Sequence, residues 1–138
     1  MKYVYTAILA GGVLLVFGSA ARADNSADTC LKKANTTLDM TGCSTAWIKR
    51  EDDALAAAWR RALVAAGGSK AATGSALLAD QRGWITFKTK VCQAFYDRAQ
   101  YGALGSSVTA PACTARLTAA RTVYLAAIAK ALTDTSTN

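Results

Sequence analysis

The helical pattern of this chain is clearest from Ser75 to Tyr101, where the sequence reads SALLADQRGWITFKTKVCQAFYDRAQY. Large apolar residues recur in it at intervals of seven, the spacing of a helix that packs along a neighbouring helix. They are Leu77 and Leu78, Trp84 and Ile85, and Val91 and Cys92, with Phe95 continuing the series. The stretch has no proline and few β-branched residues, so we expect one long helix over residues 75–101.

Three further helices are predicted around this one, which gives an all-α bundle of about four helices. The chain is rich in alanine and contains one proline, a composition typical of helices. The further helices are expected over about residues 28–40, 44–66 and 109–132. Thr41-Gly42 should end the first of these helices, and Gly67-Gly68-Ser69 the second. Ser44 can cap the second helix, Pro111 stands in the first turn of the last, and residues 133–138 read as a polar, frayed tail.

The N-terminus has the pattern of an export signal. Lys2 gives a positive start, Thr6 to Ala20 is apolar or small, and Ala21-Arg22-Ala23 matches a signal-peptidase site. We therefore predict a signal peptide over residues 1–23 and a single mature domain over residues 24–138. The alternative is a retained membrane anchor, but the apolar run is shorter than the ~20 residues that span a bilayer.

Four cysteines lie in the predicted mature domain: Cys30, Cys43, Cys92 and Cys113. An even number of cysteines in an exported chain favours disulfides, and four cysteines allow three pairings. The sequence does not choose among them, although the spacing favours Cys30–Cys43 and Cys92–Cys113. A zinc site is disfavoured because the chain has no histidine and no C-x-x-C pair. We expect no metal and no cofactor.

The charge of the chain is basic. Its formal net charge is +7, which becomes +5 when Lys2 and Arg22 leave with the signal peptide. The cations are scattered, which is typical of a solvated surface. The alternative is a basic face on the second predicted helix that binds an anionic polymer or another exported protein. Its candidate residues are Lys49, Arg50, Arg60 and Arg61. An exported destination argues against a nucleic-acid partner.

No catalytic constellation is visible. Without histidine, the usual triads and acid–base pairs are absent. Glu51, Asp52 and Asp53 are consecutive and should point in different directions on a helix. A distant pair such as Asp52 and Asp97 could converge only through the fold. The tryptophans fall on or beside the apolar stripes, so we expect core packing rather than stacking on sugars.

Two polar residues lie on the apolar stripes and need partners. Arg121 stands at the edge of the last predicted helix's stripe, and a half-buried guanidinium requires a counter-charge. We expect it to pair with Asp52 or Asp53. Gln81 should make a hydrogen bond across the bundle.

An ordered set of residues carries a family resemblance. The set comprises Cys30-x12-Cys43, Glu51-Asp52-Asp53 with Leu55 and Trp59, Gln81-x-x-Trp84-x-x-Phe87-Lys88 before Cys92, and Cys113 followed by Leu117-Thr118-x-x-Arg121. From Cys30 to about Leu125 the chain resembles the LprI-like lysozyme-inhibitor family. It departs from the family pattern at Ala56 and Trp59, where Asn and Tyr are favoured, and at Lys88-Thr89, where Arg-Asp is favoured.

The resemblance implies an exported helical protein, with family members proposed to inhibit lysozyme. Together with the signal peptide and the missing catalytic groups, it leads us to expect a periplasmic or secreted protein that is not an enzyme and binds a protein partner. A lysozyme cleft holds two carboxyl groups, so a rigid protruding loop could block it. The segment Tyr101–Val108 is the candidate, since a Cys92–Cys113 bridge would tether its ends. Its expected contact residues are Tyr101, Gly102, Gly105, Ser106 and Ser107. The alternatives are a plain helix–helix connection here and a binding module that uses the basic face.

Overall fold

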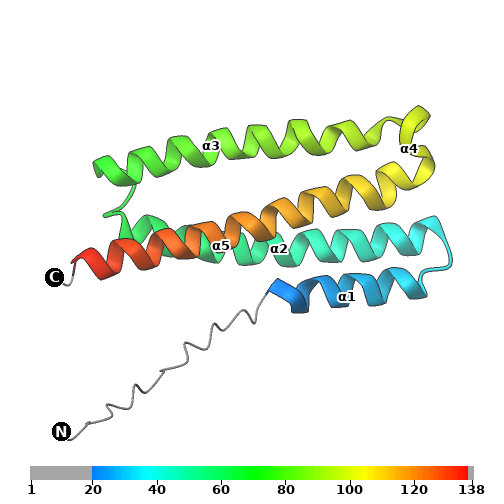
Figure 1. The fold of residues 1–138 in the computed structure, drawn as a ribbon, viewed down its shortest axis with the longest axis horizontal. Coiled ribbons are helices and arrows are strands. Elements are labelled where there is room, and N and C mark those ends of the chain that lie inside the picture. The colour runs from blue at the N-terminus through cyan, green and yellow to red at the C-terminus, as the bar shows by residue number, and fades with distance from the viewer. Residues whose placement is uncertain (1–19, 137–138) are drawn as a thin grey trace, which may run out of the picture.

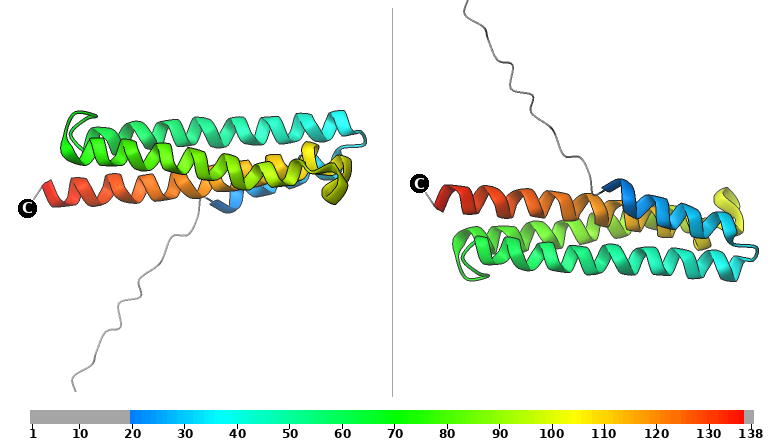
Figure 2. Two further views of the ribbon diagram at one scale, coloured as in Figure 1. Left: turned by 90° about the horizontal axis from the view of Figure 1, so that it is seen from above. Right: turned by 90° about the horizontal axis from the view of Figure 1, so that it is seen from below.

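A computed structural model of the chain describes residues 20–136 (Figures 1 and 2). Most of the predicted signal peptide, residues 1–19, lies outside this part, as do residues 137–138. The described segments are all helical, so the predicted all-α fold is confirmed for them. They are α1 (Ala20–Lys33), α2 (Thr37–Ala65), α3 (Ala72–Gln93), η1 (Ala94–Tyr96), α4 (Arg98–Leu104), η2 (Gly105–Thr109) and α5 (Ala110–Ser136).

The connection between α1 and α2 lies earlier in the chain than predicted. The Thr36 hydroxyl accepts a hydrogen bond from the Asp39 N–H at 3.1 Å, and the Asp39 carboxylate accepts one from the Thr36 N–H at 3.0 Å. This capping box pairs two backbone donors that a helix start leaves unsatisfied. The predicted break at Thr41-Gly42 is therefore wrong, because α2 begins before Gly42 and continues through it.

The last helix also departs from its predicted limits. The tail expected from residue 133 is helical as far as Ser136. The hydroxyls of Thr133 and Thr135 donate to carbonyls three and four residues earlier in the same helix. These threonines therefore keep their hydroxyls bonded while α5 continues.

Between α3 and α5 the chain forms a compact turn that we call the corner, residues 94–109. The long helix predicted from residue 75 to residue 101 ends as α3 at Gln93, and the predicted loop after Tyr101 is mostly helical. Gly102 kinks α4 with φ +63°, a conformation that glycine adopts without the strain of a side chain. The segment after it, η2, is a short stretch of π-helix.

The long helices α2, α3 and α5 run side by side, with α3 on one side of the α2–α5 pair and α1 on the other (Figures 1 and 2). The contact between α2 and α5 is the most extensive in the described chain. Small residues allow this close approach, since Ala58, Ala62 and Ala115 are fully buried. Leu125 is also fully buried, and its truncation to alanine would cost about 2–5 kcal/mol.

Two apolar clusters form the core. The larger consists of Leu55, Ala58, Ala62, Ala66, Leu77 and Leu125, with Trp59 and Trp84 packed against it. The smaller joins α1 to the α2–α5 pair through Ala27, Trp47 and Ala115. Trp47 is 3% exposed, which confirms its predicted place in the core. Trp59 and Trp84 are partly buried against the larger cluster, which also supports a packing role.

Two disulfides staple the helices. Cys30–Cys43 joins α1 to α2 with a Cα–Cα distance of 5.7 Å, and Cys92–Cys113 joins α3 to α5 at 5.6 Å. The favoured pairing is thus confirmed. Each bridge closes a modest loop and stabilises the fold by about 3 kcal/mol through the unfolded chain.

Candidate functional site

The corner is held by contacts within itself. The carboxylate of Asp97 caps α4 by accepting a hydrogen bond from the Ala99 N–H at 2.9 Å. The rings of Phe95 and Tyr101 pack edge to face with centroids 5.1 Å apart. Gly105 lies so close to the preceding segment that an added Cβ would stand 2.5 Å from the carbonyl oxygen of Phe95. The corner is therefore a packed unit rather than a flexible loop.

The corner is also fixed to the rest of the bundle. The Ser44 hydroxyl of α2 donates a buried hydrogen bond to the Ser107 carbonyl at 2.8 Å. The Cys92–Cys113 bridge ties the helices on either side of the corner. In Figure 1 the corner, at α4, lies at the end of the bundle opposite the C-terminus. The long helices therefore do not cover the outer side of the corner, which is open to a partner.

Of the five predicted contact residues, two are unavailable at the surface. Gly105 and Ser107 are buried, and Ser107 is only 4% exposed. Ser107 is therefore not available for the contact expected of it, because its side chain is buried and its hydroxyl donates to the carbonyl of Ala103 within the corner. Gly102 and Ser106 are exposed, and Tyr101 is half-buried against Phe95.

The largest exposed side chains of the corner were missed by sequence reasoning. Tyr96 and Leu104 are 54% and 53% exposed, and Arg98 is exposed between them in the sequence. The sequence predicts that Tyr96 and Arg98 lie within one helix over residues 75–101, and that prediction does not say whether their side chains are exposed. Asp97 is the residue that could have indicated their exposure. Aspartate is favoured at the start of a helix, and here Asp97 caps α4 and separates it from η1.

A groove of about 380 Å³ runs beside the corner, between the ends of α3 and α5. It is mainly apolar and is lined by Val91, Phe95, Ala112 and Leu117, with Arg116 as its cation. Val91 is 41% exposed. Phe95 and Thr109 of the corner also line this groove, so the corner and the groove adjoin. We call the exposed corner residues Tyr96, Asp97, Arg98 and Leu104 the tip.

The four cations of the predicted basic face lie on the surface of α2 but differ in their contacts. Lys49 pairs with Asp53 at 2.8 Å, and the Asp53 hydrogen bond and charge raise the pKa of Lys49 above its usual value. Arg50 donates to the Ser26 hydroxyl of α1 at 2.9 Å. Arg60 and Arg61 lie about three turns further along the helix and line a different groove. The sequence-predicted face is therefore split into two pairs.

The predicted ion pair of Arg121 is wrong. Arg121 is 7% exposed and pairs with Asp80 of α3 instead of Asp52 or Asp53. Its Nε also donates to the Oε1 of Gln81 at 2.9 Å, which confirms the hydrogen bond expected for Gln81 across the bundle. The guanidinium carbon lies 4.8 Å from the centroid of the Tyr124 ring. This side of α5 faces α3, whereas Asp52 and Asp53 are exposed on α2.

The acidic side chains that the structure describes are spread over the bundle rather than gathered in one cluster. Glu51 is buried while Asp52 and Asp53 are exposed, so the three consecutive carboxylates diverge as expected. Asp97 is engaged in capping α4. Among the described residues, no three His, Cys, Asp or Glu side chains gather as potential metal ligands. The polar chemistry of this part of the chain serves capping and helix pairing.

Comparison with known proteins gives one family. The model of the family described as lysozyme inhibitor LprI matches residues 30–125, from the first cysteine to the buried Leu125. No curated protein and no solved structure matches the chain. The matched range contains both disulfides, the corner and the Arg121 contacts.

Proposed function

Since this chain belongs to the lysozyme inhibitor LprI family, we propose that it binds a lysozyme-type cell-wall hydrolase and blocks it with the corner. Family membership supports an inhibitor-like protein with a protein partner. The observation that carries the mechanism is that the corner is held by packing and hydrogen bonds at one end of the bundle (Figure 1) and exposes Tyr96, Arg98 and Leu104.

Rigidity favours the corner because binding then orders little that was free. The Cys92–Cys113 bridge, the Ser44–Ser107 hydrogen bond and the Phe95–Tyr101 contact hold the segment before a partner arrives. Immobilising a side chain on association costs about 0.5–1.5 kcal/mol, and a preformed corner avoids much of this loss. A flexible loop of the same sequence would bind more weakly.

The side chains at the tip suit a hydrolase cleft. Aromatic and arginine side chains are enriched at binding hot spots, and a lysozyme cleft places two carboxyl groups around the scissile bond. Arg98 can offer its guanidinium to these carboxylates while Tyr96 and Leu104 cover apolar subsites. The neighbouring groove, with Arg116, offers a second point of contact.

The net charge of the whole chain does not favour approach to a basic lysozyme, but at the tip one positive and one negative charge offset each other. The mature net charge of +5 gives no attraction toward a basic partner at long range. At the corner, Asp97 and Arg98 are adjacent and opposite in sign. Physiological salt screens charges beyond about 8 Å, so the tip decides the short-range interaction.

The disulfides and the family indicate an extracytoplasmic protein, and we propose a periplasmic or secreted location after removal of residues 1–23. An inhibitor needs no catalytic group of its own. We therefore propose a non-catalytic role, in which the chain acts by occupying the cleft of another enzyme.

The test is inhibition by the oxidised protein of lysozymes from several structural classes, followed as cell-wall hydrolysis. We expect stoichiometric inhibition of at least one class, with little change between low and physiological salt, because contacts inside the cleft are shorter than the screening length of about 8 Å. Arg98→Glu should weaken inhibition about tenfold or more, since it sets like charges against the cleft carboxylates. Arg82→Glu, an equal charge change on the exposed surface of α3, should not.

The result against the proposal would be inhibition that Arg98→Glu and Arg82→Glu reduce equally. Absence of inhibition of every class would also contradict it. Circular dichroism of both variants before the assay would show that loss of activity is not loss of fold.

A further inference from the structure

A second apolar groove, of about 560 Å³, lies between the C-terminal halves of α2 and α5. We call it the distal groove because it is formed away from the corner. Its floor is made of Val64, Ala65, Ala126 and Ala129, and Val64 is 79% exposed. Arg60, Arg61 and Lys130 also line it, together with Thr133. The surface therefore combines an apolar floor with three cations.

The distal groove continues the surface on which α1 packs. Arg50 of α2 contacts α1 through its hydrogen bond to Ser26. Arg61 follows Arg50 by about three helical turns and therefore lies on the same face of α2. In α5, Ala126 follows Ala115, which packs against Ala27 of α1, by about three turns as well. The face of the α2–α5 pair thus carries a helix along one half, while the distal groove occupies the other half.

The packing of α1 shows what this face accepts. Small residues such as Ala115 let the α1 backbone approach the α2–α5 pair, and Ala27 is 2% exposed there. The floor of the distal groove repeats this composition with Ala65, Ala126 and Ala129. A helix laid in continuation of α1 would find a similar bed of small apolar side chains.

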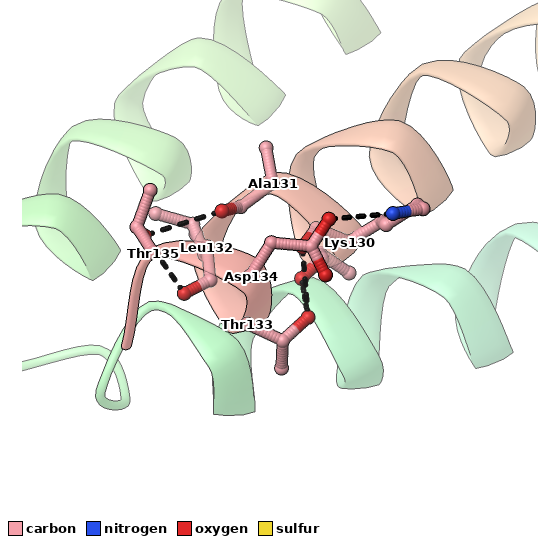
Figure 3. A network of polar contacts seen from close by, with 7 residues as sticks. Lys130, Ala131, Leu132, Thr133, Asp134 and Thr135 are labelled. Atoms are coloured by element: carbon pink, nitrogen blue, oxygen red, sulfur yellow. Dashed lines mark hydrogen bonds and ion pairs between the residues drawn. The ribbon is translucent and has the colours of Figure 1, made fainter. Parts of the chain in front are cut away.

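The positive charges around the distal groove favour a negatively charged partner. No acidic residue lines it. Lys130 pairs with Asp134 one turn later on α5 (Figure 3), but both side chains are well exposed, and such a pair exchanges readily for another carboxylate. Arg60 and Arg61 are exposed, and neither has an ion pair in the described chain. Two unpaired guanidinium groups and one ammonium group thus border an apolar floor.

We propose that the distal groove docks an acidic amphipathic helix of a second exported protein. Its apolar face would lie on the alanine floor, and carboxylates on its flanks would pair with Arg60, Arg61 and Lys130. A second copy of this chain fits poorly because the chain is itself basic. The proposal concerns a surface distinct from the corner, so it does not depend on which hydrolase the corner binds.

The test uses the oxidised chain as recovered from the periplasm of an expressing bacterium and a labelled helical peptide of about 18 residues, long enough to cover the groove. The peptide carries leucine on one face and glutamate on both flanks, and a second peptide has lysine in place of glutamate. We expect fluorescence anisotropy to show saturable binding of the glutamate peptide and none of the lysine peptide. Arg60→Glu with Arg61→Glu should raise Kd about tenfold or more.

A matched control keeps this outcome interpretable. Lys49→Glu with Arg50→Glu makes the same change in net charge on the same helix, about three turns away, and should change Kd less than about threefold. Ala129→Glu, which places a carboxylate on the groove floor, should also abolish binding. Thermal unfolding of each variant would verify the fold.

Three results would overturn the proposal. Equal weakening by the two double substitutions would show non-specific attraction to a basic surface. Binding of both peptides would show that charge does not select the occupant. Binding of phosphatidylglycerol vesicles, reduced by Arg60→Glu with Arg61→Glu, in the absence of peptide binding would assign the groove to an anionic lipid surface instead.

Discussion

The contact between Arg121 and Asp80 gives a prediction whose size follows from unequal burial. The Arg121 side chain is 7% exposed, whereas that of Asp80 is 48% exposed. Removing one member of a fully buried ion pair costs about 3–5 kcal/mol, because the other charge is left without a partner in a dry site. Removing a member of an exposed pair costs about 0–1 kcal/mol. The cost here should therefore depend on which partner is removed.

Asp80→Ala leaves the buried guanidinium without its carboxylate. Gln81 and the rings of Trp84 and Tyr124 still contact it, at 2.9 Å for the hydrogen bond and at 5.6 and 4.8 Å to the ring centroids. We expect a loss of about 2 kcal/mol, between the limits for buried and exposed pairs. Arg121→Met keeps an apolar stem in place and leaves Asp80 able to regain water, so we expect a loss of about 1 kcal/mol.

The assay is urea unfolding of the oxidised protein, followed by circular dichroism, for both single variants and the double variant. The double variant should lose about 1 kcal/mol, because no unpaired buried charge remains in it. A larger loss of stability for Arg121→Met than for Asp80→Ala would contradict this role of burial, as would two losses that simply add in the double variant. Asp53→Ala, which removes the exposed partner of Lys49, is the control and should barely move the unfolding midpoint.

Other predictions concern the corner, its bridge and the first cap. Gly83→Ala should stabilise the fold by roughly 0.5–1 kcal/mol, because a Cβ there meets nothing within 4 Å in the middle of α3. Gly105→Ala should destabilise it by about 1–3 kcal/mol, since its Cβ would stand 2.5 Å from the Phe95 oxygen, and thermal unfolding would compare the two. Cys92→Ser with Cys113→Ser should cost about 3 kcal/mol in urea unfolding, and an unchanged midpoint would contradict the role of the bridge. The pKa of Asp39 is lowered below its usual 3.8 by hydrogen bonds with the Thr36 side chain and with the backbone N–H groups of Asn35 and Thr36. The ionised Asp39 therefore stabilises the folded chain above pH 3.8, and this stabilisation is lost as the pH falls through the pKa of the folded state. Urea midpoints measured against pH should accordingly fall less steeply in acid for Asp39→Asn than for the wild-type chain.

The helical bundle was predictable because its core repeats at helical spacing. The recurrence of Leu77, Trp84 and Cys92 marked α3, and the stripe through Trp47 and Leu55 marked α2. The spacing of the cysteines favoured the observed pairing, although the sequence left all three pairings open. These features depend on local spacing, which the sequence states directly.

The helix limits were harder because single residues compete with helix continuity. Gly42 predicts a helix end, yet on the exposed surface of α2 a glycine costs only about 1 kcal/mol relative to alanine. The reciprocal cap of Thr36 and Asp39 is the stronger signal, and it is readable as a Thr three residues before an acidic residue. At the corner, glycines and serines suggested a loop, but the bridge and the buried Ser44–Ser107 hydrogen bond hold the segment in helical turns.

The partners of the polar groups could not be read from helix phase alone. The position of Arg121 on α5 predicts that it is half-buried, but the side of the helix that faces α3 depends on how the three long helices pack. For the same reason the distal groove, built from residues far apart in the sequence, has no local signature. The exposure of Tyr96 and Leu104 depends likewise on the fold of the corner.

The most direct test of the central claim is amide hydrogen exchange of the oxidised chain, alone and mixed at one-to-one ratio with lysozymes of each class. We expect, with at least one class, slowed exchange over residues 94–109 and along the groove beside them, with the distal groove between α2 and α5 unchanged. Protection confined to the α2 cations or to the distal groove would contradict the corner as the inhibitory surface. No protection with any lysozyme would contradict inhibition itself.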